Sequence, residues 1–323
     1  MKDKFGREID YLRVSVTDKC NLRCIYCMNE KESDFWENDN KLTDNEIYRV
    51  IRETTKIGIK KIRITGGEPL IRPGIVELIG GINKITEVEE IYMTTNGVLL
   101  EDKVEDLVKN GLKGVNISLD SLKSERFKFL TRKGQLSKVL NAIDKCLEFN
   151  LKIKINIVIV NDINKDEVLD FVELTREKKI DIRFIELMPM GVAINYKGVN
   201  NKEILDIIHS NYNDILEVKR DKRDGPAKYI KIKYGQGRIG FINAISNCFC
   251  KECNRVRLTA DGFLKPCLHF DYGVDLRRLL RDGITNEALN EVIHESIYNK
   301  PERHLFLEKC NHKESKFMNQ IGG

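Results

Sequence analysis

The chain has 323 residues and is 41% hydrophobic, which is enough to bury one large core, or a core and a smaller second domain. Its 55 lysines and arginines exceed its 50 aspartates and glutamates without forming a basic tail, so the composition does not indicate a nucleic-acid-binding protein and fits a small anionic ligand. No apolar run approaches the roughly 20 residues of a membrane span. We therefore expect no membrane segment and a cytoplasmic location.

The segment from residue 11 to residue 188 alternates short β-branched runs with longer stretches of helical periodicity, a pattern typical of βα units on a parallel sheet. Thr43 and Glu46 have capping-box spacing, and Pro73 is expected in the first turn of a helix. Six units predict an α/β fold with a partial (βα)6 TIM-like barrel, short of the eight units that close one. The predicted strands are Leu12–Val16, Lys61–Thr65, Glu90–Thr94, Gly114–Leu119, Lys152–Val160 and Asp181–Leu187.

Three cysteines follow the first predicted strand in the spacing Cys20-x3-Cys24-x2-Cys27. A structural zinc site nearly always has four protein ligands, and no fourth cysteine or histidine lies near in the sequence. A 4Fe-4S cluster held by three cysteines leaves one iron open, and S-adenosylmethionine could bind that iron through its amino and carboxylate groups. The spacing favours such a cluster, with Tyr26 placed to pack on an adenine ring. The alternative is an incomplete zinc site or an ordinary loop.

The next predicted strand ends in Thr65-Gly66-Gly67-Glu68-Pro69. Paired glycines let the backbone approach a ligand closely, and strand-end carbonyls could bind an ammonium group. Gly-Gly alone more often marks a plain turn, and its place one βα unit after the cysteines is what favours a binding role. Because barrel chemistry sits at the carboxyl ends of strands, we expect one site to collect Cys20 and the segments 66–68, 94–97, 118–120 and 186–188.

Beyond residue 195 the pattern changes to a helix near Lys202–Ser210 and strands near Lys228–Tyr234 and Ile239–Ile245, followed later by amphipathic segments at Val274–Arg281 and Asn286–Ile297. We interpret residues 1–195 as the barrel, 196–310 as a smaller α+β domain and 311–323 as a tail ending in Gly-Gly. Residues 235–240 match the dinucleotide fingerprint G-x-G-x-x-G but precede a strand-like run, so we predict a hairpin turn there. There is no P-loop motif.

A second cysteine group has the spacing Cys250-x2-Cys253-x13-Cys267, with Arg255 and Arg257 directly after its second member. Three thiolates again suit a 4Fe-4S cluster with one open iron, and guanidinium groups bind phosphates or a purine edge. The alternative is a zinc ribbon completed by His269 or Cys248. The sequence therefore predicts two metal centres, of which the second has two interpretations.

The first cysteine spacing and the Gly-Gly-Glu-Pro turn together resemble the radical S-adenosylmethionine (SAM) superfamily. Within it, nearly the whole chain resembles the GTP 3′,8-cyclases, which begin molybdenum cofactor synthesis. The strings that carry this resemblance are LRVSVTDKCNLRCIYCM, KIRITGGEPLIR, TTNG, NISLDSL, IRFIELMPMG, FCKECNRVRLTADGFLKPCL and the terminal Ile321-Gly322-Gly323. Asn29 stands where proline is usual and Asp162 where glycine is common, neither at a ligand position.

The resemblance implies two 4Fe-4S clusters, S-adenosyl-L-methionine as cofactor and GTP as substrate. A triphosphate carries about four negative charges, which fits several basic residues placed inside predicted strands. The implied roles are the first cluster for Cys20, Cys24 and Cys27; the second for Cys250, Cys253 and Cys267; SAM contacts for Tyr26, Gly67, Ser118 and Met188; GTP contacts for Arg13, Arg63, Thr94, Lys154, Arg183, Arg255, Val256 and Arg257; and catalytic roles for the first three cysteines, Arg13, Gly322 and Gly323.

The resemblance also implies the reaction. A 5′-deoxyadenosyl radical from reductive cleavage of SAM would take hydrogen from C3′ of GTP, and C3′ would bond to C8, giving (8S)-3′,8-cyclo-7,8-dihydroguanosine 5′-triphosphate. We expect an unidentified electron donor, and a cyclic pyranopterin monophosphate synthase that takes up the product. We expect no nucleic-acid or membrane partner. A homodimer is possible. The alternatives are a radical SAM enzyme that modifies peptides, for which more cysteines would be expected, and a non-catalytic iron-sulfur nucleotide-binding protein.

Overall fold

Six parallel strands form the centre of one twelve-stranded sheet, as the βα pattern predicted. The computed structural model describes residues 1–30, 40–219, 225–308 and 314–322. Within the sheet each of these strands pairs with the next along the chain. Their bounds lie within three residues of the predicted ones: β1 (Tyr11–Ser15), β2 (Lys61–Thr65), β3 (Glu90–Thr95), β4 (Leu112–Ser118), β5 (Lys152–Ile157) and β6 (Asp181–Ile185).

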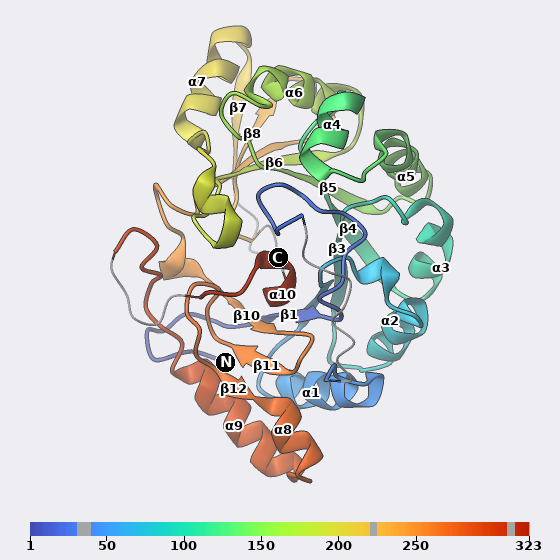
Figure 1. Cartoon of the computed structure of the whole chain (residues 1–323), viewed down its shortest axis with the longest axis vertical. Coiled ribbons are helices and arrows are strands. Elements are labelled where there is room, and N and C mark those ends of the chain that lie inside the picture. The colour runs from blue at the N-terminus through green and yellow to red at the C-terminus, as the bar shows by residue number, and fades with distance from the viewer. Residues whose placement is uncertain (31–39, 220–224, 309–313, 323) are drawn as a thin grey trace.

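Helices cover the outer face of the curved sheet (Figure 1). The capping box predicted at the first helix is confirmed, since the Glu46 amide donates to Thr43 Oγ1 at 3.3 Å and the Thr43 amide donates to Glu46 Oε2 at 2.7 Å. The prediction for Pro73 is wrong, because α2 begins two residues later, after a left-handed Gly74. The helices are α1 (Asp44–Lys56), α2 (Ile75–Asn83), α3 (Val104–Lys109), α4 (Ser124–Thr131), α5 (Leu136–Glu148), α6 (Val168–Glu177), α7 (Asn201–Asn211), α8 (Leu276–Arg281), α9 (Asn286–Tyr298) and α10 (Met318–Ile321).

The C-terminal part of the chain extends both edges of the same sheet. On one edge β10 (Arg255–Leu258) runs parallel to β1 and is followed by the antiparallel β11 (Phe263–Lys265) and β12 (Val274–Asp275). On the other edge β9 (Ile239–Ile242) runs parallel to β6 and is followed by the antiparallel β8 (Lys228–Ile232) and β7 (Ile215–Val218). Among the described residues β9 and β10 do not pair with each other, so the barrel stays open between them.

The hydrophobic core lies between the sheet and its helices, where the apolar faces of strands and helices meet. α1 shows why: Ile47, Val50 and Ile51 recur at helical spacing and are fully buried against the sheet. The hairpin predicted at the G-x-G-x-x-G match is confirmed, because residues 233–238 join the antiparallel strands β8 and β9. In the described ranges no helix combines the length and apolar character needed to cross a membrane.

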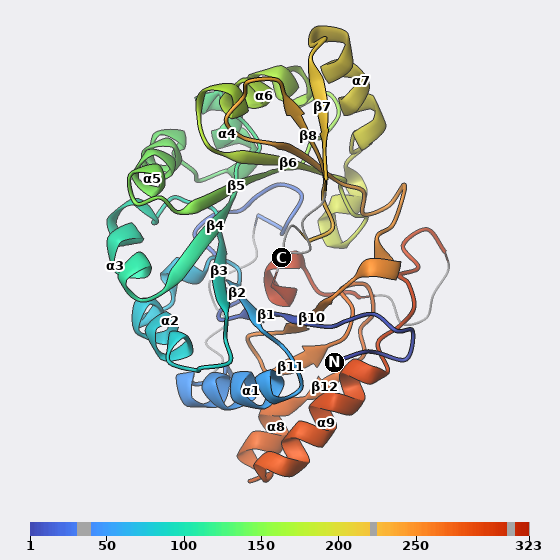
Figure 2. The ribbon, with the colours of Figure 1, turned by 180° about the vertical axis from the view of Figure 1, so that it is seen from behind.

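Both views of the ribbon place the C-terminal end of the chain in the middle of the ring of strands (Figures 1 and 2). α10 lies there, and it holds Asn319, whose side-chain amide donates to the Asp18 carbonyl at 3.0 Å. Gly322 follows it in a left-handed conformation, beside Ser15 and Thr65 at the ends of β1 and β2. The tail therefore reaches the carboxyl ends of the first strands. The division of the chain at residue 195 stays a prediction.

Candidate active site

A cavity of about 1020 Å³ fills the inside of the curved sheet. All six cysteines of the two predicted groups contribute to its wall. The wall also carries twelve lysines and arginines against two aspartates, so its charge is strongly positive. The aspartates are engaged locally, since Asp120 accepts a hydrogen bond from Tyr26 and Asp181 forms an ion pair with Arg238 at 2.6 Å. The volume is larger than a single small ligand needs.

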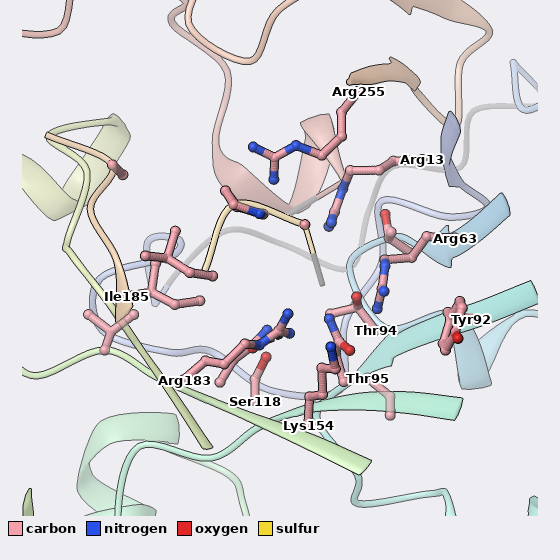
Figure 3. A pocket seen from close by; sticks show the side chains of 18 of the residues that line it. Arg13, Arg63, Tyr92, Thr94, Thr95, Ser118, Lys154, Arg183, Ile185 and Arg255 are labelled. Carbon is pink, nitrogen blue, oxygen red and sulfur yellow. Dashed lines mark hydrogen bonds between the residues drawn. The ribbon is translucent and has the colours of Figure 1, made fainter. Parts of the chain in front are cut away.

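Three arginines stand side by side across neighbouring strands of this wall. In the parallel register Arg13 on β1 lies opposite Arg63 on β2 and opposite Arg257 on β10. Residues paired in this way share one face of a sheet, and here that face is the cavity (Figure 3). Burial and the neighbouring arginines lower the pKa of Arg13 to about 9, although Tyr11 partly opposes this. The arrangement concentrates positive charge on one wall of the cavity.

A second basic group faces the first from β5 and β6 (Figure 3). Arg183 donates to Asn156 Oδ1 from Nε at 2.9 Å, and the Lys154 ammonium lies 3.4 Å from the Tyr229 hydroxyl. Burial lowers the pKa of Arg183 below its ordinary value. Because these side chains and the arginines of β1, β2 and β10 converge on one space, an anion of several charges is the ligand that fits.

Buried polar atoms without partners mark the same space. Arg63 Nη1, Arg257 Nε and Thr94 Oγ1 are buried and make no hydrogen bond to any residue that the structure describes. A buried donor left unpaired costs about 1 to 3 kcal/mol, more when it is charged. A ligand with several oxygen atoms would satisfy these groups, which makes the ligand-free arrangement unfavourable by itself.

Two aromatic residues that the sequence analysis missed complete this wall. The Tyr11 hydroxyl accepts a hydrogen bond from Arg63 Nε, and the Arg63 guanidinium carbon lies 5.2 Å from the centre of the Tyr92 ring. Burial raises the pKa of Tyr11, but the charges of Arg63 and Arg13 outweigh it and lower that pKa to about 7. The sequence did contain a signal for these two tyrosines, because they alternate with hydrophobic residues along β1 and β3. Every second side chain of a strand points to the same face, and here that face lines the cavity.

The glycine pair positions the first cysteine loop. A Cβ atom at Gly67 would lie 2.1 Å from the Lys19 carbonyl oxygen, and one at Gly66 would lie 2.5 Å from the Thr17 carbonyl oxygen. The Gly67 amide donates to Thr17 O at 2.7 Å. Only glycine allows this close approach of the turn to the segment that leads into Cys20. The pair thus has a structural role in addition to lining the cavity.

Glu68 links the same turn to β3. Its fully buried carboxylate accepts hydrogen bonds from Thr95 Oγ1 and the Asn96 amide, both at 2.7 Å, and from the Leu70 amide at 3.1 Å. Burial raises the pKa of Glu68 to about 7, and the three donors work against that rise. The Asn96 side chain then donates to Asn21 Oδ1 at 2.8 Å. This chain of contacts fixes the cysteine loop against two strand ends.

Cys253 of the second group lies in a different electrostatic setting from the other buried cluster thiols, since burial raises the pKa of Cys250 to about 11, as it does for Cys20 in the first group. Burial raises the pKa of the Cys24 thiol well above its ordinary value. At Cys253 burial also raises the pKa, but the charges of Lys300 and Arg255 outweigh it and lower the pKa to about 6. The Lys300 ammonium is itself held by the Arg255 carbonyl at 3.0 Å. Among the described residues a histidine does approach Cys248 and Cys250, but it is His304, which the sequence analysis missed, and not His269.

Most of the predicted site residues lie in this one cavity. The cysteines, Tyr26, Gly67, Met188, Ser118, Thr94 and the predicted lysine and arginines all line it. Val256 does not, because its side chain points to the opposite face of β10 and is buried in the hydrophobic core, so any ligand contact would come from its backbone. Gly322 is described and buried, whereas Gly323 lies outside the described residues. The individual ligand roles stay predictions.

The fold and the cysteine loop define a radical SAM enzyme. The model of the Radical SAM superfamily matches residues 14–175, and that of Molybdenum Cofactor Synthesis C matches residues 180–306. A solved structure, Streptococcus suis SuiB bound to S-adenosylmethionine, resembles this fold with a TM-score of 0.65 over 88% of this chain and 68% of SuiB, at 16% identity.

Full-length relatives narrow the class. A GTP 3′,8-cyclase of Clostridium perfringens is 58% identical over 100% of both chains, and one of Clostridium botulinum is 48% identical over 100% of both chains. This chain belongs to the GTP 3′,8-cyclase family of molybdenum cofactor biosynthesis.

Proposed function

We propose that this chain converts GTP to (8S)-3′,8-cyclo-7,8-dihydroguanosine 5′-triphosphate in the cavity of the partial barrel. The observation that carries the proposal is the row Arg63, Arg13 and Arg257, held in register across β2, β1 and β10. A triphosphate is the part of GTP that such a row suits, because charge-assisted hydrogen bonds to several guanidinium groups offset the loss of its hydration.

The two cysteine groups have the properties expected of ligands for two 4Fe-4S clusters. In each group three thiols open on the cavity, and neither group is packed tightly enough to surround a single ion. Three thiolates leave one iron of a cluster open to a ligand. We assign the first cluster to Cys20, Cys24 and Cys27, and the second to Cys250, Cys253 and Cys267. When bound, the first supplies the electron that cleaves SAM into methionine and the 5′-deoxyadenosyl radical.

The residues around the first group would hold the cofactor and keep water out. Tyr26 is fixed by its hydrogen bond to Asp120, whose Oδ1 accepts from the Val158 amide at 2.8 Å, so these two hydrogen bonds orient its ring. Ser118 and Met188 line the cavity from the carboxyl end of β4 and the segment after β6. Positioning of this kind supplies much of the catalysis, because the reacting atoms must meet within contact distance.

The basic residues would bend GTP between the two cysteine groups. The row on β2, β1 and β10 lies toward the second group, since Arg257 is on β10, which begins two residues after Cys253. Arg183 and Lys154 act from the opposite wall. Held from both sides, the ribose C3′ would face the first group while the guanine C8 stays within reach of C3′. The tail at Gly322 would close the cavity at the ends of β1 and β2.

The test is an anaerobic reconstitution with iron and sulfide, followed by dithionite, SAM and GTP, with products identified by mass spectrometry. We expect about eight irons per chain, as two clusters of four require, with GTP-dependent 5′-deoxyadenosine and a GTP isomer of unchanged mass. About four irons with bound zinc and unchanged GTP would overturn the proposal. That result would mean that the C-terminal cysteines bind a structural zinc ion.

A further inference from the structure

A set of metal-binding side chains lies beside the second cysteine group and differs from its predicted ligands. One ligand atom each from Cys248, Cys250 and His304 lie within 4.8 Å of one another. In a tetrahedral zinc site, with bonds of about 2.0 to 2.3 Å, ligand atoms lie roughly 3.3 to 3.8 Å apart. Thiolates on a 4Fe-4S cluster bind different irons and stand farther apart. The limit of 4.8 Å is somewhat wider than the zinc spacing, so the three side chains would need only a small closing movement to hold a single ion.

Hydrogen bonds of a buried arginine hold the segments of this set together. Arg7 is buried near the N-terminus, where its Nη1 donates to the Cys250 carbonyl at 2.9 Å and to the Glu302 carbonyl at 2.8 Å. Its Nη2 donates to the Pro301 carbonyl at 2.7 Å. The segment that carries His304 is thereby fastened to the turn that carries Cys250, although the two are far apart in the sequence.

An ion can reach this set from solvent, and the imidazole of the set has a ring nitrogen available to bind it. Cys248 is exposed and Cys250 is buried, so the set runs from the surface inward. Within the described part of the chain, His304 Nε2 is buried and makes no hydrogen bond of ordinary geometry, although the Ala244 carbonyl is close enough to interact with the ring. The other ring nitrogen, Nδ1, lies 3.5 Å from the Phe306 amide, a long contact that a change of tautomer gives up at small cost. An ion at this place would satisfy the imidazole and leave one position for water.

We propose that Cys248, Cys250 and His304 form a mononuclear site for a thiophilic divalent cation, Zn²⁺ or Fe²⁺, in the chain that lacks its second cluster. Binding releases the protons of the two thiols, and water fills the fourth position. Because Cys250 belongs to both sets, an ion here excludes the second cluster. This exclusion rests on the proposed function, whereas the binding of the ion does not.

The first experiment is a titration of the anaerobic, cluster-free full chain with Co²⁺, whose bond to thiolate gives a charge-transfer band and whose tetrahedral site gives visible d–d bands. We expect Cys248→Ser and His304→Ala each to weaken binding by roughly 100-fold or more, because each removes one of three ligands and loss of an outer-shell partner alone costs about 10- to 100-fold. Cys253→Ser and Cys267→Ser are the matched controls and should bind Co²⁺ as the unaltered chain does. Tight binding that persists in Cys248→Ser would overturn the proposal. Cys248 is exposed, so this variant should fold.

The second experiment measures exclusion, by adding one equivalent of Zn²⁺ before reconstitution with iron and sulfide. We expect the unaltered chain to stop at about four irons and Cys248→Ser to reach about eight. Equal iron content in both would contradict exclusion. If no second cluster forms even without Zn²⁺ while the Co²⁺ pattern holds, the proposed function fails and the mononuclear site stands. If both clusters form and Co²⁺ binding does not depend on Cys248, the mononuclear site is ruled out and the proposed function stands.

Discussion

Arg13 on β1 stands directly opposite Arg257 on β10 in the parallel register. Arg257 is buried and Arg13 is partly buried in the wall of a cavity whose charge is strongly positive. Burial and the neighbouring Arg255 lower the pKa of Arg257 to about 10. Like charges held close in a site of low dielectric repel each other, so the ligand-free protein carries an unfavourable energy that an anion relieves.

Replacing Arg257 should therefore weaken GTP binding and at the same time raise the stability of the ligand-free chain. We expect Arg257→Met to weaken GTP binding about 30-fold or more, since loss of one partner of a buried charge pair costs roughly 2 kcal/mol or more. The thermal midpoint of the ligand-free chain should rise by about 2 °C for each kcal/mol of repulsion relieved. Calorimetric titration and a thermal melt measure the two effects. The control is Arg278→Met, since Arg278 is exposed on α8; unchanged affinity in Arg257→Met would count against the arginine row.

Gly67→Ala should prevent assembly of the first cluster. The added Cβ would lie 2.1 Å from the Lys19 carbonyl, so the segment before Cys20 must move. We expect iron content after reconstitution to fall to about four per chain, and stability to fall by about 1 to 3 kcal/mol. Gly283→Ala is the control, because Gly283 has a positive φ but nothing within 4 Å. Full iron content in Gly67→Ala would show that the loop adapts.

Glu68 should make stability depend on pH. Burial raises its pKa in the folded chain to about 7 from an ordinary value of 4.5, so the folded state binds the proton more tightly than the unfolded state. This group's contribution to stability is therefore largest below about pH 4.5 and is lost as the pH rises to about 7.

The variant that tests this is Glu68→Gln, which does not titrate. Its amide group would also face the Asn96 amide, so we expect it to be less stable than the unaltered chain at low pH. The difference in unfolding free energy, measured by denaturant titration of the cluster-free chain, should shrink across that pH interval. Parallel pH curves for the two proteins would rule out Glu68 as the titrating group.

Arg7→Met should destabilise the whole chain. The side chain of Asp3 is fully buried and pairs with Arg7 at 2.6 Å, so the substitution leaves a buried charge without its partner. Breaking such a pair costs about 3 to 5 kcal/mol. A double variant with Asp3→Asn should recover part of this loss, which a double-mutant cycle by denaturant unfolding would measure. Strict additivity of the two substitutions would show that the pair is not coupled.

Gly322→Ala should impair turnover and leave the clusters intact. Gly322 has a φ of +81°, and a Cβ there would lie 2.7 Å from Thr65 Oγ1 and 2.8 Å from Ser15 Cβ. The tail would have to shift, and a misplacement of about 1 Å in an active site costs roughly 100-fold in rate. Product formation and iron content are the two measurements, with Gly6→Ala as the control. Unchanged turnover would remove the tail from the proposed site.

The sequence by itself determined the six central strands and the two cysteine groups. Hydrophobic periodicity is local, so it predicted β2 to the residue, and a cysteine spacing of three and two residues confines three thiols to one loop wherever the chain folds. The charged residues within the strands were equally visible, because a basic side chain in a parallel strand needs a reason to be there.

Only the tertiary structure decided which of these residues meet. β10 pairs with β1, which sets Arg257 beside Arg13 and turns Val256 into the core. His304 joins Cys250 because Arg7 fastens two distant segments together. A one-residue slip in the register of β10 would exchange its two faces, and no local pattern fixes the register between strands so far apart in the sequence. That register depends on how the whole sheet curves and packs, which is a property of the complete chain.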